Sequence, residues 1–179
     1  MKIRLDPEHA KALTFQDYSP PGEIDGVFHV PLTKHRALTG WFMEYLRLTA
    51  GKAQALPADF EVRQVSLARA VAGRINAFHL HPKQVQDELW TAADGTMLVW
   101  LVDVRAGSPT LGVKRSYVLS AEQPSLLHVP AGVAHGYKAG PEGALLLYTM
   151  NSQFNPDDPN EGRLPWDYFG KELWEADRG

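Results

Sequence analysis

Residues 73–95 read GRINAFHLHPKQVQDELWTAADG, and this stretch decides the fold. His79 and His81 stand two positions apart within it. Because successive side chains of a β-strand point to opposite faces, both imidazoles lie on one face, and the apolar Phe78 and Leu80 lie on the other. Histidines on the inner face of a small barrel meet at its mouth, where ligand sites are built. The stretch therefore predicts a barrel strand that turns a histidine pair toward a binding site.

The rest of the chain continues in short β-like runs separated by turn formers. The runs are FEVRQVSLARA, RINAFHLH, ELWTAA, TMLVWLVDV, GVKRSYVLS, LLHVP and ALLLYTM. Gly and Pro at this spacing are typical of an all-β sandwich or barrel. We expect one antiparallel jelly-roll domain over residues 1–179, with a barrel core from about 40 to 154. Residues 1–34 should form an arm or short strands, residues 40–48 a strand or a short helix, and the aromatic-containing residues 155–179 an ordered C-terminal arm.

Composition narrows the range of functions. The chain has 179 residues, no cysteine and a net charge of −3. The lack of cysteine excludes disulfides and thiol catalysis. This charge balance predicts no broad basic face, so nucleic acid and anionic membranes are not expected partners. The N-terminal MKIRLDPEHA has no apolar signal core, and no apolar run approaches the roughly 20 residues of a membrane helix, so a cytoplasmic location is expected.

Two segments resemble the two motifs of the cupins, a superfamily of small jelly-roll proteins. Residues 73–95 match G-x5-H-x-H-x3–4-E-x6-G with a longer hairpin before the glutamate, and residues 130–135, PAGVAH, match P-x-G-x2-H. Three imidazoles and one carboxylate suit a divalent ion such as Fe, Mn, Ni or Zn. The alternative is a set of satisfied polar residues in a wet pocket. In both cases we expect four residues to converge in one barrel mouth: His79, His81, Glu88 and His135.

Three segments in the second half of the chain carry a more specific resemblance. LVDVRAGSPTLG (101–112) is similar to V-D-x-R-x-x-SPT-[FY]-G, and LLYTMNSQFNP (146–156) to LY-x-x-x-x-x-Y-x-P. LSAEQPSLLHVPAGVAHGY (119–137) is similar to LS-x-E-n…-IP-x-G-[FV]-AHGF. These are segments of the dTDP-4-dehydrorhamnose 3,5-epimerase family. The resemblance implies a dimeric jelly roll that epimerises C3 and C5 of a nucleotide-linked 4-keto-6-deoxy sugar without a metal.

The resemblance also implies roles for individual residues. The family's catalytic base, the His of its RGLH segment, falls on His79. Its general acid, a Tyr, falls on Tyr148, and a Glu of its nucleotide site falls on Glu44. The Asp that orients the family's catalytic His has no clear counterpart, and Asp167 is the candidate that this sequence offers.

Other positions depart from the family pattern. Asn76 stands where the family has Arg, His81 where it has Gln and Glu88 where it has Lys, whereas His135 is shared. We expect all four to contact the substrate, unless His81, Glu88 and His135 join His79 on a metal. A cationic Lys can stabilise an enolate oxygen, and so can a metal ion, so the two arrangements are chemical alternatives.

The leading prediction is an isomerase, a nucleotide-sugar epimerase that needs no cofactor and removes a proton next to the ketone of a nucleoside-diphosphate 4-keto-6-deoxy sugar. The alternatives are a metal-dependent cupin acting as an oxygenase or isomerase on a small molecule, and a non-catalytic sugar-binding cupin. If all four residues bind a metal, His79 cannot also be the base. A homodimer is expected, because the all-apolar run 97–102 needs cover on both faces and the family pairs its sheets across a two-fold axis.

Overall fold

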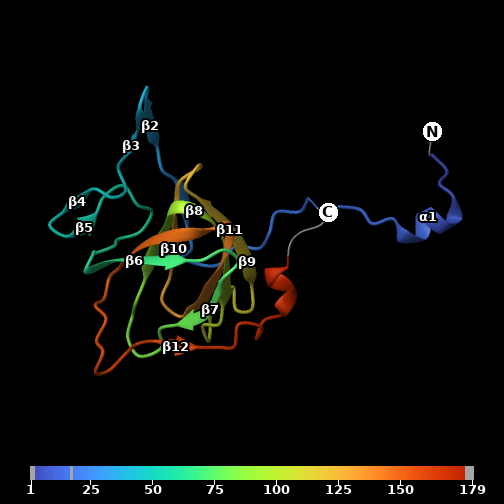
Figure 1. Ribbon diagram of the computed structural model, residues 1–179. Helices are drawn as coiled ribbons and strands as arrows, with labels where there is room; N and C mark the ends of the chain where they lie inside the picture. The colour runs from blue at the N-terminus through green and yellow to red at the C-terminus, as the bar shows by residue number, and fades with distance from the viewer. Residues whose placement is uncertain (1–2, 17, 176–179) are drawn as a thin grey trace.

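The computed structural model describes residues 3–16 and 18–175, and most of its regular structure is β-strand. Eight strands form one antiparallel sheet with the order β1-β10-β8-β11-β7-β12, to which β6 adds beside β11 and β9 beside β8 (Figure 1). Their bounds are β1 His29–Pro31, β6 Gln64–Ala70, β7 Ile75–Leu80, β8 Glu88–Asp103, β9 Lys114–Ser120, β10 Ser125–Val129, β11 Val133–Met150 and β12 Gly162–Arg163. The predicted all-β antiparallel architecture is confirmed.

Two long strands, β8 and β11, run through both layers of the roll. Residues 97–103 of β8 pair with residues 133–139 of β11, and this layer continues through β9 on one side and β7 on the other. Residues 88–95 pair with residues 144–150, and that layer continues through β10 and β6. The layers bend apart at Gly95, whose φ is +68° and where a Cβ would lie 2.1 Å from the carbonyl oxygen of Gly143. Only glycine fits this corner, because any other side chain would meet backbone.

The main core lies between the two layers. It is built from alternate residues of the long strands, with Met97, Val99 and Leu101 of β8 almost fully buried. Alternation at a period of two turns these side chains inward and their neighbours outward. Each layer therefore presents one apolar face to the other.

The C-terminal segment covers the outer face of β7 and β8. β12 pairs with β7, and a short 3₁₀ helix, η1 (Lys171–Trp174), buries Trp174 in a cluster with Phe78 and Val102. The indole of Trp100 donates a 2.7 Å hydrogen bond to the Leu173 carbonyl. The described residues of the expected C-terminal arm therefore pack against the sheet as far as Trp174, and residues 176–179 of that arm lie outside the described part of the chain. This C-terminal segment covers part of the outer face of residues 97–102. The apolar character of that run therefore does not by itself require a second chain.

The first sixty residues differ from the expected boundaries. The sheet begins before residue 40, because β1 pairs with β10. Two small hairpins follow outside the main sheet, formed by β2 (Lys34–Ala37) with β3 (Gly40–Met43) and by β4 (Leu48–Thr49) with β5 (Lys52–Ala53) (Figure 1). The 40–48 segment therefore contains strand and no helix.

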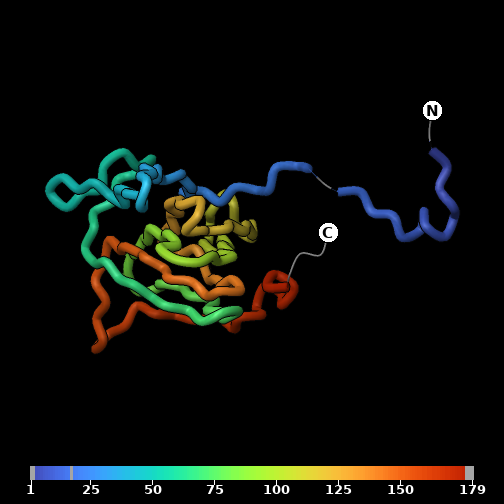
Figure 2. Tube along the Cα trace, turned by 45° about the horizontal axis from the view of Figure 1, so that its top comes forward, coloured from blue at the N-terminus to red at the C-terminus, as the bar shows by residue number. Residues whose placement is uncertain are grey.

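The N-terminal segment carries one short helix, α1 (Pro7–Ala12), and leads away from the barrel (Figure 2). Asp6 caps α1 by accepting a 2.9 Å hydrogen bond from the Glu8 amide. No helix in the described part of the chain is long and apolar enough to cross a membrane.

Candidate active site

One mouth of the barrel opens into a cavity of about 440 Å³. The strands β7, β8 and β11 supply its polar walls, because their inward-facing positions end at this mouth. Six of the seven predicted site residues line it together: Asn76, His79, His81, Glu88, His135 and Tyr148. The seventh, Glu44, does not; it follows β3, lines a different cavity and pairs with Arg47 at 2.9 Å. The two cupin-like segments thus meet in one place, as their spacing predicted.

His79 is held on both sides of its ring. Its Nε2 lies 2.9 Å from the Oδ1 of Asn76, and its Nδ1 lies 3.5 Å from the Oε2 of Glu161. Bonding to His79 is the main reason why the pKa of Glu161 lies below its usual range, so this carboxyl group is ionised at neutral pH. A carboxylate beside an imidazole stabilises the imidazolium that forms when the ring accepts a proton. The pair therefore has the composition of an oriented general base, in which Nε2 can accept a proton once a substrate replaces its contact with Asn76.

Glu161 is the residue that the sequence did not reveal. It stands immediately before β12, and β12 reaches β7 through the pairing of Gly162 with Leu80 and of Arg163 with His79. The expected candidate, Asp167, does not line the cavity. In the sequence, Glu161 is marked only as an acidic residue in the polar segment NEGR. Its position beside His79 becomes visible only through the pairing of β12 with β7.

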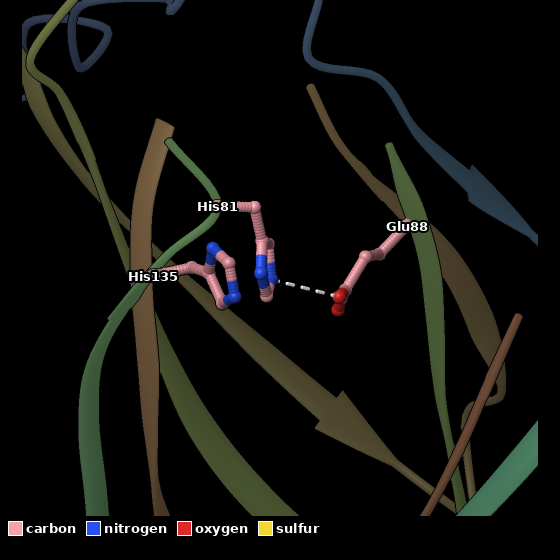
Figure 3. A group of neighbouring side chains, drawn as sticks. All are labelled: His81, Glu88 and His135. Atoms are coloured by element: carbon pink, nitrogen blue, oxygen red, sulfur yellow. Dashed lines mark ion pairs between the residues drawn. The ribbon is translucent and has the colours of Figure 1, made fainter. Parts of the chain in front are cut away.

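His81, Glu88 and His135 form a second cluster, deeper in the same cavity (Figure 3). All three residues are buried, at 6%, 4% and 2% exposed. Each contributes a potential ligand atom, and these atoms lie within 4.8 Å of one another. His81 lies between the other two, with its Nε2 3.0 Å from the Oε1 of Glu88. His79 is not a member of this cluster.

The charges of the cluster follow from its contacts. Burial would raise the pKa of Glu88, but His81, His135 and the indole of Trp90 outweigh it and hold the pKa at about 2. Burial lowers the pKa of His135 to about 4, because the charged form loses its hydration. At neutral pH the cavity floor therefore contains an ionised carboxylate and a neutral imidazole.

Tyr148 lies on β11, in register with Ser66 of β6. Burial raises the pKa of its phenol above the usual value. The phenol consequently stays protonated at neutral pH and can donate a proton into the cavity. Arg163, which lines the same cavity and is exposed, donates a 3.3 Å hydrogen bond to Asn76.

Fold and site together define a small jelly-roll protein with a histidine–carboxylate pair, a phenol and a buried cluster of two histidines and one carboxylate in one barrel mouth. The family model described as dTDP-4-dehydrorhamnose 3,5-epimerase matches residues 21–168. The spore coat polysaccharide biosynthesis protein SpsL of Bacillus subtilis (strain 168) is 39% identical over 145 residues, which cover 80% of this chain and 91% of SpsL. The chain therefore belongs to the dTDP-4-dehydrorhamnose 3,5-epimerase family.

Two further relatives agree with this assignment. A dTDP-4-dehydrorhamnose 3,5-epimerase of Mycobacterium tuberculosis (strain CDC 1551 / Oshkosh) is 29% identical over 137 residues, covering 75% of this chain and 66% of that protein. The crystal structure of ChmJ, a 3'-monoepimerase from Streptomyces bikiniensis in complex with dTDP-quinovose, superposes with a TM-score of 0.70 at 27% identity, covering 82% of this chain and 74% of ChmJ.

Proposed function

We propose that this nucleotide-sugar epimerase acts on a nucleoside-diphosphate 4-keto-6-deoxy sugar and inverts a carbon next to the ketone. The observation that carries the proposal is the placement of His79 with Glu161, and of Tyr148, around one cavity in a chain of this family. Relatives named as epimerases favour this function over a metal-dependent oxygenase or a sugar-binding cupin. The reaction is balanced without any redox cofactor, because a proton leaves and a proton returns.

In the proposed mechanism His79 removes a proton from the carbon next to the ketone. The C–H electron pair moves toward the carbonyl group, whose oxygen becomes the enolate oxygen. Glu161 stabilises the resulting imidazolium of His79 and keeps its ring in place, as a positioning residue. Tyr148 then donates a proton to the opposite face of the carbon, which inverts it. General acid–base groups of this kind typically contribute about 10²–10⁴-fold each.

Recognition of the diphosphate needs positive charge near the mouth. Asn76 has replaced the Arg of the family pattern, but Arg163 lies directly beside Asn76 and reaches solvent. A guanidinium there can make bidentate, charge-assisted contacts to phosphate oxygens. We assign Arg163 to the diphosphate. Glu44 remains the predicted nucleotide contact, although it does not line the cavity of its own chain.

The proposal includes a homodimer. β6 is an edge strand that pairs only with β11 among the described residues, and it exposes Val65 and Leu67 on its outer face. A long apolar edge strand is a template for pairing with another chain. A two-fold dimer through this edge would cover both side chains.

The base assignment is tested by exchange of solvent deuterium into a dTDP-linked 4-keto-6-deoxy sugar. His79→Ala should lower exchange by about 10²–10⁴-fold, because it removes the imidazole that the proposal assigns as the base. His9→Ala, on the exposed helix α1, is the matched control and should exchange at the wild-type rate. Full exchange by His79→Ala would show that another group is the base.

A further inference from the structure

We propose that His81, Glu88 and His135 bind one divalent first-row transition metal ion, and that His79 stays outside the coordination sphere. Two imidazoles and one carboxylate are ligands that such ions accept. The three groups come from separate strands or strand ends and meet at the cavity floor, with potential ligand atoms within 4.8 Å of one another (Figure 3). His79 is instead held by Asn76 and Glu161.

The tautomers of both imidazoles are fixed for metal binding. The Nδ1 of His81 lies 2.6 Å from the carbonyl oxygen of Asn160, and the Nδ1 of His135 lies 2.9 Å from that of Val133. A carbonyl oxygen only accepts, so each Nδ1 carries a proton, and Nε2 is the nitrogen that a metal ion would take in place of any proton it carries. Metal-ligating histidines characteristically donate their second ring nitrogen to a backbone carbonyl or carboxylate in this way.

The carboxylate is oriented just as firmly. Glu88 Oε1 accepts a 2.8 Å hydrogen bond from Gln86, and Oε2 accepts a 2.6 Å hydrogen bond from the indole of Trp90. Gln86 is itself held by Ser152 at 2.8 Å. This outer shell keeps the carboxylate facing His81 and has the form of the second shell around a metal ligand.

One atom of the cluster faces a carboxylate but lacks the hydrogen bond that its burial requires. The Nε2 of His81 is fully buried and makes no hydrogen bond, although it lies 3.0 Å from Glu88. A buried polar atom without a partner costs free energy, so such an atom in an otherwise satisfied site calls for an explanation. A metal ion between His81, Glu88 and His135 would satisfy this nitrogen and pair with the buried carboxylate.

Because His79 lies outside the metal site, a bound ion could assist epimerisation without displacing the base. This role rests on the proposed epimerase function. An enolate oxygen needs a positive charge, but Glu88 occupies the position at which the family pattern has Lys. A metal ion held by His81, Glu88 and His135 would supply that charge as a Lewis acid, while His79, outside its coordination sphere, could still take the proton. The base and the metal are thus compatible in one pocket.

Binding is tested without any substrate, on full-length protein that carries no histidine tag and has been dialysed against a chelator. Co²⁺ is the probe, because its d–d absorption reports its ligands, and elemental analysis gives the stoichiometry. One Co²⁺ per chain is expected for the wild type and for His79→Ala. Glu88→Gln and His135→Gln should each weaken binding by more than about 100-fold, the upper cost of an outer-shell change.

Near-UV circular dichroism of each variant shows whether it is folded, and Glu88→Gln keeps the shape of the side chain. Two results would overturn the site: no Co²⁺ binding by the folded wild type, or loss of binding in folded His79→Ala.

Deuterium exchange then tests the role of the metal ion in epimerisation. Exchange should fall on chelation and return with metal. Unchanged exchange by chelated protein would overturn the catalytic role and leave the epimerase intact, whereas metal binding without exchange in any form would contradict the epimerase and leave the metal site intact.

Discussion

At the residue scale, the two proposed acid–base groups differ in the step that each performs. Tyr148→Phe removes the proton donor but leaves His79 and Glu161 in place. We expect this variant to exchange deuterium at the reacting carbon while inversion falls by about 10²–10⁴-fold, because abstraction survives and protonation from the opposite face does not. NMR of the sugar ring separates the two processes. Equal loss of exchange and inversion would show that Tyr148 acts before or during abstraction.

Arg163 is expected to act in binding alone. Arg163→Ala should raise KM about tenfold or more with little change in kcat, because it removes a contact made equally in the ground state and the transition state. Arg4→Ala is the matched control, since Arg4 is exposed in the N-terminal segment that leads away from the barrel. Steady-state kinetics at varied substrate concentration decide the matter. A fall in kcat at unchanged KM would contradict the assignment to the diphosphate.

Individual residues of the site were predictable to different degrees. The two-residue spacing of His79 and His81 fixes their common strand, and the PAGVAH segment brings His135 beside them. Glu161 was not predictable, because its contact with His79 depends on a two-residue strand that pairs with β7 across about eighty positions of sequence. The separation of His79 from the other three ligand-type residues also depends on side-chain packing, which spacing does not define.

At the scale of elements, the loop between β8 and β9 depends on one carboxylate. Asp103 is fully buried and accepts hydrogen bonds from Arg105, Ser108 and Thr110. Its contacts with Arg105 are the main reason why its pKa lies far below the usual value. In the sequence, this Asp and Arg stand two positions apart at the start of the segment DVRAGSPT.

The depressed pKa of Asp103 determines how its contribution depends on pH. A carboxyl group with a lower pKa in the folded state stabilises the fold above its unfolded-state pKa of about 4, and this contribution is lost as pH falls below that value. Asp103→Asn should therefore cost about 3 kcal/mol of unfolding free energy at pH 7, because it leaves a partly buried Arg105 without its charge partner. The difference from wild type should shrink at pH 3.

Urea unfolding at both pH values measures this difference. Asp158→Asn is the control, because its pair with Lys83 is exposed on both sides and should cost less than about 1 kcal/mol. The same cost for Asp103→Asn at pH 7 and at pH 3 would show that its charge does not stabilise the loop.

At the scale of the whole molecule, the exposed edge of β6 predicts the assembly. Light scattering at micromolar concentration should give twice the mass of one chain. The double change Val65→Lys and Leu67→Lys should give a monomer, because like charges would face each other across the two-fold axis and the apolar contact would be lost. A wild-type monomer would contradict the dimer, and a dimer in the double variant would place the interface elsewhere.

The barrel itself was predictable as a whole, whereas its margins were not. Period-two patterns and Gly/Pro turns in residues 64–150 reflect burial between two layers, which sequence records directly. The hairpins of residues 34–53 pair locally but are mostly exposed, whereas the entry of β1 into the sheet depends on pairing of His29 with the distant Leu127. The sequence of these elements therefore shows no clear periodicity from which their boundaries could be predicted.

Deuterium incorporation by the wild-type protein tests the central claim most directly. The metal-replete enzyme is incubated in D₂O with a dTDP-linked 4-keto-6-deoxy sugar, and the ring protons are followed by NMR. The ketone at C4 acidifies its neighbours, so the account predicts loss of the proton signal at C3 or C5 together with inversion at that carbon. Retention of both protons across a panel of 4-keto sugar nucleotides, by folded protein with and without added metal, would contradict it.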